Sequence, residues 1–143
     1  MASPLRSLLL LAALALAMSS VLCAQSGRAQ RLVGGLMDAD GDDVDVQRML
    51  SFAMSEFNKM SNDKYLRRPV NLLSARKQVV AGMNYFLEVE IGKTKCTKSQ
   101  ANTYSLVRCP FDDLKEKTRC RFMVHNKPWL NTTTLMSTNC HYT

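Results

Sequence analysis

The side chains that could perform catalysis are few in this sequence. Beyond residue 26 it contains two histidines and four cysteines: His125, His141, Cys96, Cys109, Cys120 and Cys140. A nucleophilic cysteine paired with histidine would need a reduced thiol, and a zinc site would need several of these side chains together, for which Cys140 and His141 beside Cys120 are the candidates. No Ser–His–acid spacing, phosphate-binding glycine loop or HExxH motif stands out. We therefore expect a protein that is not an enzyme and that uses no metal or cofactor.

The first 26 residues have the features of a secretory signal peptide. Arg6 precedes the apolar run from Leu8 to Met18, and Ala24-Gln25-Ser26 fits the small-x-small cleavage rule. The run is shorter than the roughly 20 residues that a membrane-spanning helix needs. We predict that the mature chain begins at Gly27, with cleavage after Ala24 as the alternative. The product would be a secreted, extracellular domain over residues 27–143 with no membrane span.

Removal of that segment changes the charge and the cysteine count. The chain has 143 residues, with 19 Lys and Arg against 12 Asp and Glu, so residues 27–143 number 143 − 26 = 117 and carry +7 − 1 = +6. With 46% hydrophobic residues, a chain of that size can form one packed domain. Cys23 is lost with the signal, and the four remaining cysteines predict two disulfides with three pairings open. Disulfides explain these cysteines better than zinc does.

An amphipathic helix is the clearest element in residues 27–143. Its apolar residues recur at spacings of three and four: Val46, Met49, Leu50, Ala53, Met54, Phe57 and Met60. We expect these methionines to fill the core and not to bind metal or haem. The acidic run from Asp38 to Asp45 starts with calcium-loop spacing, but Asp43 stands where that loop needs glycine. Capping of the helix is the better interpretation of the acids, and Ser61-Asn62-Asp63 should end the helix.

From Val70 onwards the apolar period changes to two. Residues 83–92 alternate apolar and polar side chains, which predicts a half-buried strand. Residues 70–80 form a second strand-like run, so residues 78–82 should be a hairpin. Further strands are expected near 122–127 and 132–141, with Pro128-Trp129 interrupting them. One helix followed by four antiparallel strands predicts an α+β domain with the helix across one face of the sheet.

Three apolar features are unusual for a core. The first is Leu32-Val33-Gly34-Gly35, on a short arm spanning residues 27–35. The second is the hairpin tip Gln78–Gly82, which is apolar where turns are normally polar, and in which Gly82 is expected to adopt a positive φ. The third is Trp129, the only tryptophan, in a predicted turn. Each has a plainer explanation, namely a frayed terminus, a buried turn or a tryptophan folded back onto the core. Together they favour a binding surface at one edge of the sheet.

These residues also carry a resemblance to a known family. The chain is similar to the type 2, secreted cystatins over nearly all of residues 27–143. Three motifs occur in the order of the family: the Leu-Val-Gly arm, the QxVxG hairpin at Gln78–Gly82 and the Pro-Trp hairpin. Four cysteines follow the first hairpin in the sequence. The resemblance implies a cystatin-like fold, in which one long α-helix packs across a twisted antiparallel sheet of four to five strands. It also implies the disulfides Cys96–Cys109 and Cys120–Cys140.

The resemblance implies a function as well: reversible, tight-binding inhibition of papain-like cysteine proteases such as cathepsins. The arm and the two hairpins would form a wedge that fills the active-site cleft of the protease. The implied contact residues are Leu32, Val33, Gly34, Gln78, Val79, Val80, Ala81, Gly82, Pro128 and Trp129. In some members a second face inhibits legumain-type proteases. Asn62 is the matching residue here, and its alternative role is the C-cap of the helix.

Some features of this chain depart from the family pattern or add to it. The interval from Cys96 to Cys109 looks longer than the pattern, in a region that lies away from the wedge in the family. Asn131-Thr132-Thr133 is an N-glycosylation sequon beside Trp129, and a glycan there is expected to weaken binding to some proteases. The family's first hairpin is strained and permits domain swapping, so we expect mainly a monomer, with a swapped dimer as an alternative state.

A second class of function fits the positive charge alone. A secreted domain with a net charge of +6 could bind polyanions or acidic membrane surfaces. Its Lys and Arg residues are scattered without a dense run, and every wedge residue is present. Protease inhibition is therefore the main prediction and polyanion binding a secondary one, and no nucleic-acid partner is expected.

Overall fold

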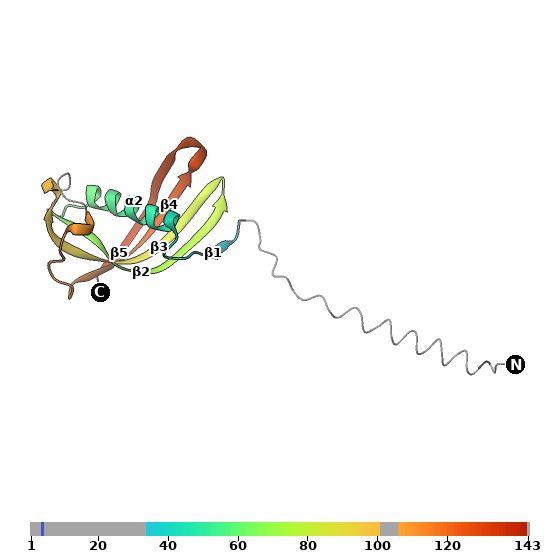
Figure 1. Cartoon of the computed structure of the whole chain (residues 1–143), viewed down its shortest axis with the longest axis horizontal. Helices are drawn as coiled ribbons and strands as arrows, with labels where there is room; N and C mark the ends of the chain where they lie inside the picture. The colour runs from blue at the N-terminus through green and yellow to red at the C-terminus, as the bar shows by residue number, and fades with distance from the viewer. Residues whose placement is uncertain (1–3, 5–33, 101–105, 143) are drawn as a thin grey trace. The chain divides into compact units, whose positions relative to one another are not determined.

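The computed structural model describes Pro4, residues 34–100 and residues 106–142. The long helix and all the strands described belong to one unit, Val33–Thr143 (Figure 1). The predicted signal peptide, apart from Pro4, lies outside the described residues, and so do Leu32 and Val33 of the arm. Their proposed roles therefore stay predictions.

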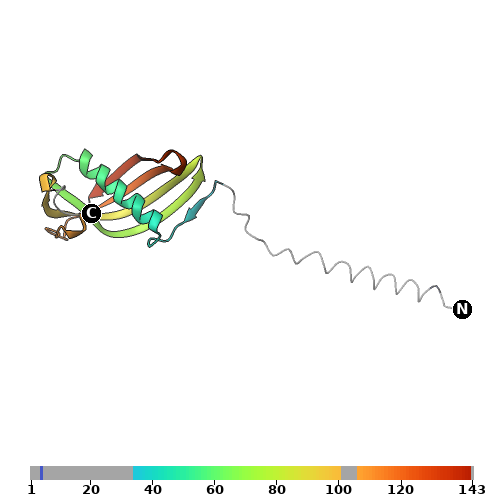
Figure 2. The same cartoon turned by 45° about the horizontal axis from the view of Figure 1, so that its top comes forward.

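Within the described residues, five antiparallel strands form one sheet that a single long helix crosses. In chain order the elements are β1 (Leu36–Asp38), α2 (Val44–Met60), β2 (Tyr65–Val80), β3 (Gly82–Thr97), β4 (Lys117–Lys127) and β5 (Thr132–Tyr142). The strands lie in the order β1-β2-β3-β4-β5, so each strand pairs with the one before it in the chain. Figures 1 and 2 show α2 lying across one face of this sheet. The predicted α+β fold is confirmed.

The core lies between α2 and the sheet. Its main members are Val46, Met49, Leu50, Ala53 and Met54 of α2, Leu87, Val89 and Ile91 of β3, and Phe122 and Val124 of β4. Both predicted periods, about 3.6 on the helix and two on the strands, place these residues on the buried side. Full burial of one such side chain contributes roughly 1.5–3 kcal/mol. Met60 was predicted in the same stripe but is 60% exposed, because it is the last helical residue and the chain leaves the helix at Ser61.

The ends of α2 only partly follow the prediction. Asp43 is the N-cap, and its carboxylate accepts a hydrogen bond from the backbone N–H of Asp45 at 2.8 Å. Asp38 does not cap the helix, because it lies in β1 opposite Arg76. At the other end Ser61 is the C-cap, so the alternative role considered for Asn62 is wrong.

β2 begins at Tyr65, before the predicted start at Val70. Pro69 lies inside this strand although proline cannot donate a ladder hydrogen bond. β1 pairs only with Arg76–Gln78 of β2, so the edge of β2 at Pro69 has no strand partner that would need the missing N–H. β1 itself was not predicted as a strand, because three residues are too few to show a period.

Two disulfides connect the four cysteines, in the pairing that the family resemblance implied. Cys120 and Cys140 face each other across β4 and β5, and Cys96 at the end of β3 is bonded to Cys109. The zinc alternative at Cys120, Cys140 and His141 is therefore wrong, because two of its three ligands form a disulfide. No helix in the described part of the chain is long and apolar enough to cross a membrane.

Candidate functional site

The first hairpin, Gln78–Gly82, joins β2 to β3 through a very tight turn. Val80 pairs directly with Gly82, which leaves Ala81 alone at the tip. Gly82 has φ +109°, as predicted, in a region that side-chain-bearing residues rarely adopt. Val79 and Val80 are 43% and 40% exposed, so the explanation of a buried turn is wrong. The tip therefore presents apolar side chains to solvent.

The second hairpin, Pro128–Asn131, joins β4 to β5. Pro128 starts a 3₁₀ turn that ends at Leu130, and proline suits this first position because its φ is already fixed. Asn131 closes the turn in the left-handed region with φ 48°, and its N–H donates to the carbonyl of Pro128 at 3.0 Å. Trp129 is 65% exposed, so it does not fold back onto the core.

The two hairpins lie at the same end of the sheet (Figure 1), and the first packs against β4, the strand that leads to the second. An alanine Cβ built at Gly82 would lie 2.6 Å from the carbonyl oxygen of Asn126, in the strand that leads to the second hairpin. Beside this contact, Nδ1 of His125 and Oδ1 of Asn84 are 2.6 Å apart, and Asn84 is buried. The absence of a side chain at Gly82 thus allows both its positive φ and its close approach to β4.

The arm reaches the same end of the domain. Gly34 has φ +91°, and its carbonyl oxygen accepts a hydrogen bond from Nε2 of Gln78 at 2.7 Å. Two residues later Leu36 pairs with Gln78 in the β1–β2 ladder and is 45% exposed. The structure therefore brings together Gly34, the first hairpin and the second hairpin, whereas Leu32 and Val33 lie outside the described residues.

Exposed apolar side chains lie on β1 and on both hairpins at this end of the sheet. We call this set the apolar ridge; its described members are Leu36, Val79, Val80, Trp129 and Leu130, each at least 40% exposed. Several exposed large apolar side chains at one end of a small domain are typical of a binding site. Sequence reasoning missed Leu36, which belongs to the ridge, and the contact between Asn84 and His125 on the neighbouring strands. Nothing in the local sequence around an Asn and a His on neighbouring strands indicates that their side chains will be in contact.

The chain around Asn62 lies at the other end of β2. Asn62 is exposed, immediately after the C-cap of α2. Next to it Asp63 accepts a hydrogen bond from the N–H of Tyr65 at 3.1 Å and forms an ion pair with Arg67 at 3.3 Å. Partial burial opposes ionisation, but the Tyr65 hydrogen bond and the charges of Arg67 and Lys93 together hold the pKa of Asp63 below its ordinary value. Asn62 is thus an exposed residue on an ordered connection.

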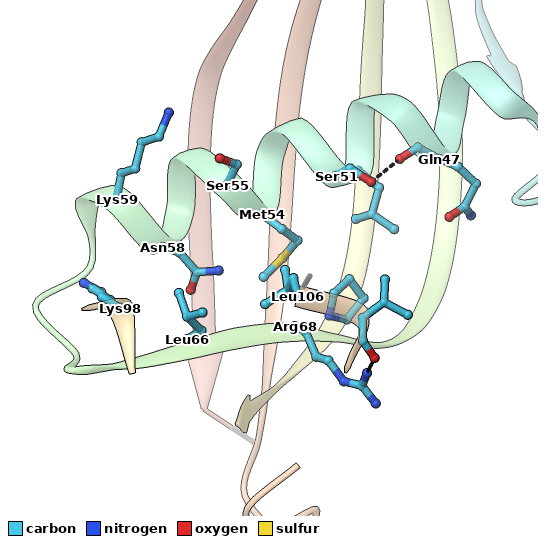
Figure 3. A pocket seen from close by; sticks show the side chains of 13 residues that line it. Gln47, Ser51, Met54, Ser55, Asn58, Lys59, Leu66, Arg68, Lys98 and Leu106 are labelled. Atoms are coloured by element: carbon cyan, nitrogen blue, oxygen red, sulfur yellow. Dashed lines mark hydrogen bonds between the residues drawn. The ribbon is translucent and has the colours of Figure 1, made fainter. Parts of the chain in front are cut away.

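A cavity of about 800 Å³ lies between α2, the start of β2 and the 3₁₀ turn Leu106–Arg108 (Figure 3). Its apolar lining includes Leu50, Met54, Leu66 and Leu106. Two of its polar residues already bind the protein's own backbone. Asn58 exchanges two hydrogen bonds with Arg67, and the guanidinium of Arg68 donates to the carbonyl of Val107 and lies 4.0 Å from the Phe111 ring centroid. The apolar ridge is therefore the better candidate for the functional site.

Comparisons with known proteins identify similar sequences and a similar structure. A family described as the Cystatin domain matches residues 34–129, a span that contains the first hairpin and reaches Trp129. The chain is 51% identical to Cystatin-C of Bos taurus, over 96% of this chain and 97% of the relative, and 49% identical to Cystatin-C of Homo sapiens, over 98% of each. The crystal structure of dimeric human cystatin F is similar with a TM-score of 0.70 and 28% identity, covering 85% of this chain and 97% of that one.

Proposed function

The chain belongs to the cystatin family, and on that premise we propose that it is a reversible, tight-binding inhibitor of papain-like cysteine proteases such as cathepsins. The observation that carries the proposal is the apolar ridge, at the end of the sheet where the two hairpins and the end of the arm lie. An apolar ridge can enter an apolar cleft and exclude water from it. It acts by occupying the cleft and needs no catalytic group of its own.

Each segment has a distinct role in this proposal. Leu32 and Val33 enter substrate pockets on one side of the catalytic cysteine, and Gly34 provides the bend that leads to them. The first hairpin lies against the catalytic cysteine, and Pro128 and Trp129 pack on the far side of the cleft. Two pre-formed hairpins lose little conformational entropy on binding, which favours tight association from a modest contact area.

Titration of active papain with the refolded, disulfide-bonded protein tests this function. Trp129→Ala should weaken inhibition by roughly 30-fold or more, as for an interface hot spot of 2 kcal/mol, and deletion of residues 27–33 should also weaken it. Val107→Ala is the matched control, because Val107 is 78% exposed and lies outside the ridge. Absence of inhibition by the folded monomer would refute the proposal and favour the polyanion-binding alternative.

The same proposal includes secretion and glycosylation. Residues 1–26 direct export and are removed, and Asn131 then carries an N-glycan. Asn131 is exposed at the tip of the second hairpin, which supports access by the glycosylating enzyme. Mass spectrometry of protein from a secreting cell line gives the mature N-terminus and the occupancy of the sequon.

A second inhibitory site for legumain-type proteases is proposed at Asn62. Its support is that Asn62 is exposed and that Ser61, not Asn62, caps the helix, so the asparagine is free of that structural role. Asn62→Ala should abolish inhibition of legumain and leave inhibition of papain unchanged. Equal inhibition of legumain by both proteins would contradict the proposal.

A domain-swapped dimer is proposed as an alternative state of the chain. β2 and β3 are each 16 residues long and are separated by Ala81 alone, so opening of the first hairpin would let them continue as one strand into a second copy. Such a dimer would lose the first hairpin. Size-exclusion chromatography should therefore give an inhibitory monomer and a dimer that does not inhibit papain, and an equally inhibitory dimer would contradict the swap.

A further inference from the structure

Gln78 connects the arm to the first hairpin through its side chain. Its Nε2 donates to the carbonyl oxygen of Gly34 at 2.7 Å, in a partly buried hydrogen bond. Its backbone lies opposite Leu36 in the β1–β2 ladder and opposite Asn84 in the β2–β3 ladder. One residue is therefore in contact with the arm, the edge strand and the first hairpin.

Gly34 is the first described residue of the arm, and its backbone conformation is unusual. Its φ of +91° is accessible to glycine but rarely to other residues, and an added Cβ would lie 3.6 Å from the carbonyl oxygen of Val79. Glycine has no side chain with which to hold this conformation, and its backbone is the most permissive of all residues. The hydrogen bond from Gln78 supplies the missing restraint, because it holds the carbonyl group of the residue that turns.

We propose that Gln78, unlike the other residues of the first hairpin, is a positioning residue: it acts on protease binding through the arm and not by direct contact with the protease. The inference rests on the proposed function, in which Leu32 and Val33 enter the cleft. By fixing the carbonyl of Gly34, Gln78 reduces the freedom that the arm loses on binding. Loss of one hydrogen bond of ordinary net strength corresponds to about a fivefold change in affinity.

The test is a double-mutant cycle between Gln78 and the arm. Gln78→Met keeps the length of the side chain and removes the donor; it is made both in the chain that starts at residue 27 and in a chain that starts at Gly34. Gln47→Met is the matched control, because Nε2 of Gln47 also donates to a backbone carbonyl, that of Gly41 at 2.6 Å, outside the ridge. Inhibition constants for papain are measured for all six proteins.

We expect Gln78→Met to weaken inhibition about three- to tenfold in the long chain and less than twofold in the short one. Gln47→Met should change neither. Equal factors in the two backgrounds would overturn the inference, because they would mean direct contact with the protease, and so would the absence of an effect in the long chain.

A second measurement separates this inference from the proposed function. Nitrogen-15 relaxation of the Gly35 amide, which belongs to the same peptide unit as the Gly34 carbonyl, reports the order of the turn without any protease. Gln78→Met should lower the Gly35 order parameter and Gln47→Met should not. If the wild-type chain fails to inhibit papain, the proposed function falls, whereas an unchanged Gly35 order parameter overturns the positioning role of Gln78.

Discussion

Replacement of Gly82 by alanine tests the geometry of the site with a single methyl group. The residue has φ +109°, a conformation that alanine rarely adopts, and backbone strain of this kind costs roughly 1–3 kcal/mol. The new Cβ would also lie 2.6 Å from the carbonyl oxygen of Asn126. Because real Cβ contacts closer than 3.0 Å essentially do not occur, the first hairpin and the strand before the second must separate by at least 3.0 − 2.6 = 0.4 Å.

Two consequences follow for the alanine variant. If the hairpin keeps its shape, the strain is stored, and the free energy of unfolding in urea should fall by about 2 kcal/mol. If the hairpin relaxes to another conformation, restoring it in the protease cleft requires the same roughly 1–3 kcal/mol, which weakens inhibition by a factor of about 5 to 150. We expect Gly82→Ala both to lower the free energy of unfolding and to weaken inhibition, each by part of the amount given. Urea unfolding and papain inhibition on the same preparation measure them separately.

Gly41→Ala is the matched control for this experiment. Gly41 has no positive φ, and an added Cβ would meet Cδ2 of Leu72 at 3.4 Å, an ordinary contact. This variant should unfold and inhibit like the wild type. If Gly82→Ala also unfolds and inhibits like the wild type, the inferred close contact of Gly82 with Asn126 is refuted. If Gly82→Ala loses stability but inhibits as tightly as the wild type, the contact stabilises the fold and is not part of the inhibitory surface.

Three further predictions concern charge, modification and cross-links. Because the pKa of Asp63 is lowered, the ionised carboxylate stabilises the fold at pH values above its ordinary pKa of 3.8. Asp63→Asn should therefore lower the free energy of unfolding by about 1 kcal/mol between pH 5 and 8. Urea titrations should show this difference disappearing as the pH falls through the lowered pKa. Thr133→Ala removes the sequon without changing the left-handed Asn131, so protein from glycosylating cells should lose a glycan and inhibit some cathepsins more tightly; identical inhibition constants would count against an effect of the glycan. Replacement of both Cys120 and Cys140 by serine opens a cross-link with a sequence separation of 20 and should lower stability by roughly 3 kcal/mol, with inhibition retained below the unfolding temperature.

The elements that the sequence predicts well are those with a long apolar period. The stripe on α2 and the alternation on β3 each continue over several turns or residue pairs, so they specify which side is buried without knowledge of the partner. The approximate position of the site was also predictable, because Val79, Val80 and Trp129 are apolar where the pattern predicts turns. In an antiparallel meander, alternate turns lie at the same end of the sheet. The contact of Gly82 with Asn126 confirms that the two turns do so here.

The contacts that hold the site together were not predictable. The hydrogen bond from Gln78 to Gly34 joins residues 44 positions apart, and that between Asn84 and His125 joins residues 41 positions apart. Such pairs depend on strand register, which the local pattern of one strand does not fix. β2 was predicted too short because its first five residues, Tyr65–Pro69, do not alternate apolar and polar side chains.

The three segments at this end of the sheet keep their shapes for different physical reasons. These reasons determine how substitutions in different segments should combine in their effects on inhibition. The second hairpin depends on the fixed φ of Pro128 and on the left-handed Asn131, which are local to the turn. In the described part of the arm, the side chain of Gln78 donates a hydrogen bond to the carbonyl of Gly34. The first hairpin depends on Gly82, whose missing Cβ also allows the approach to Asn126. Substitutions in the second hairpin or the arm should therefore affect one segment each and multiply in their effects on inhibition. A substitution at Gly82 should alter two segments at once, and its effect should not multiply with that of Trp129→Ala.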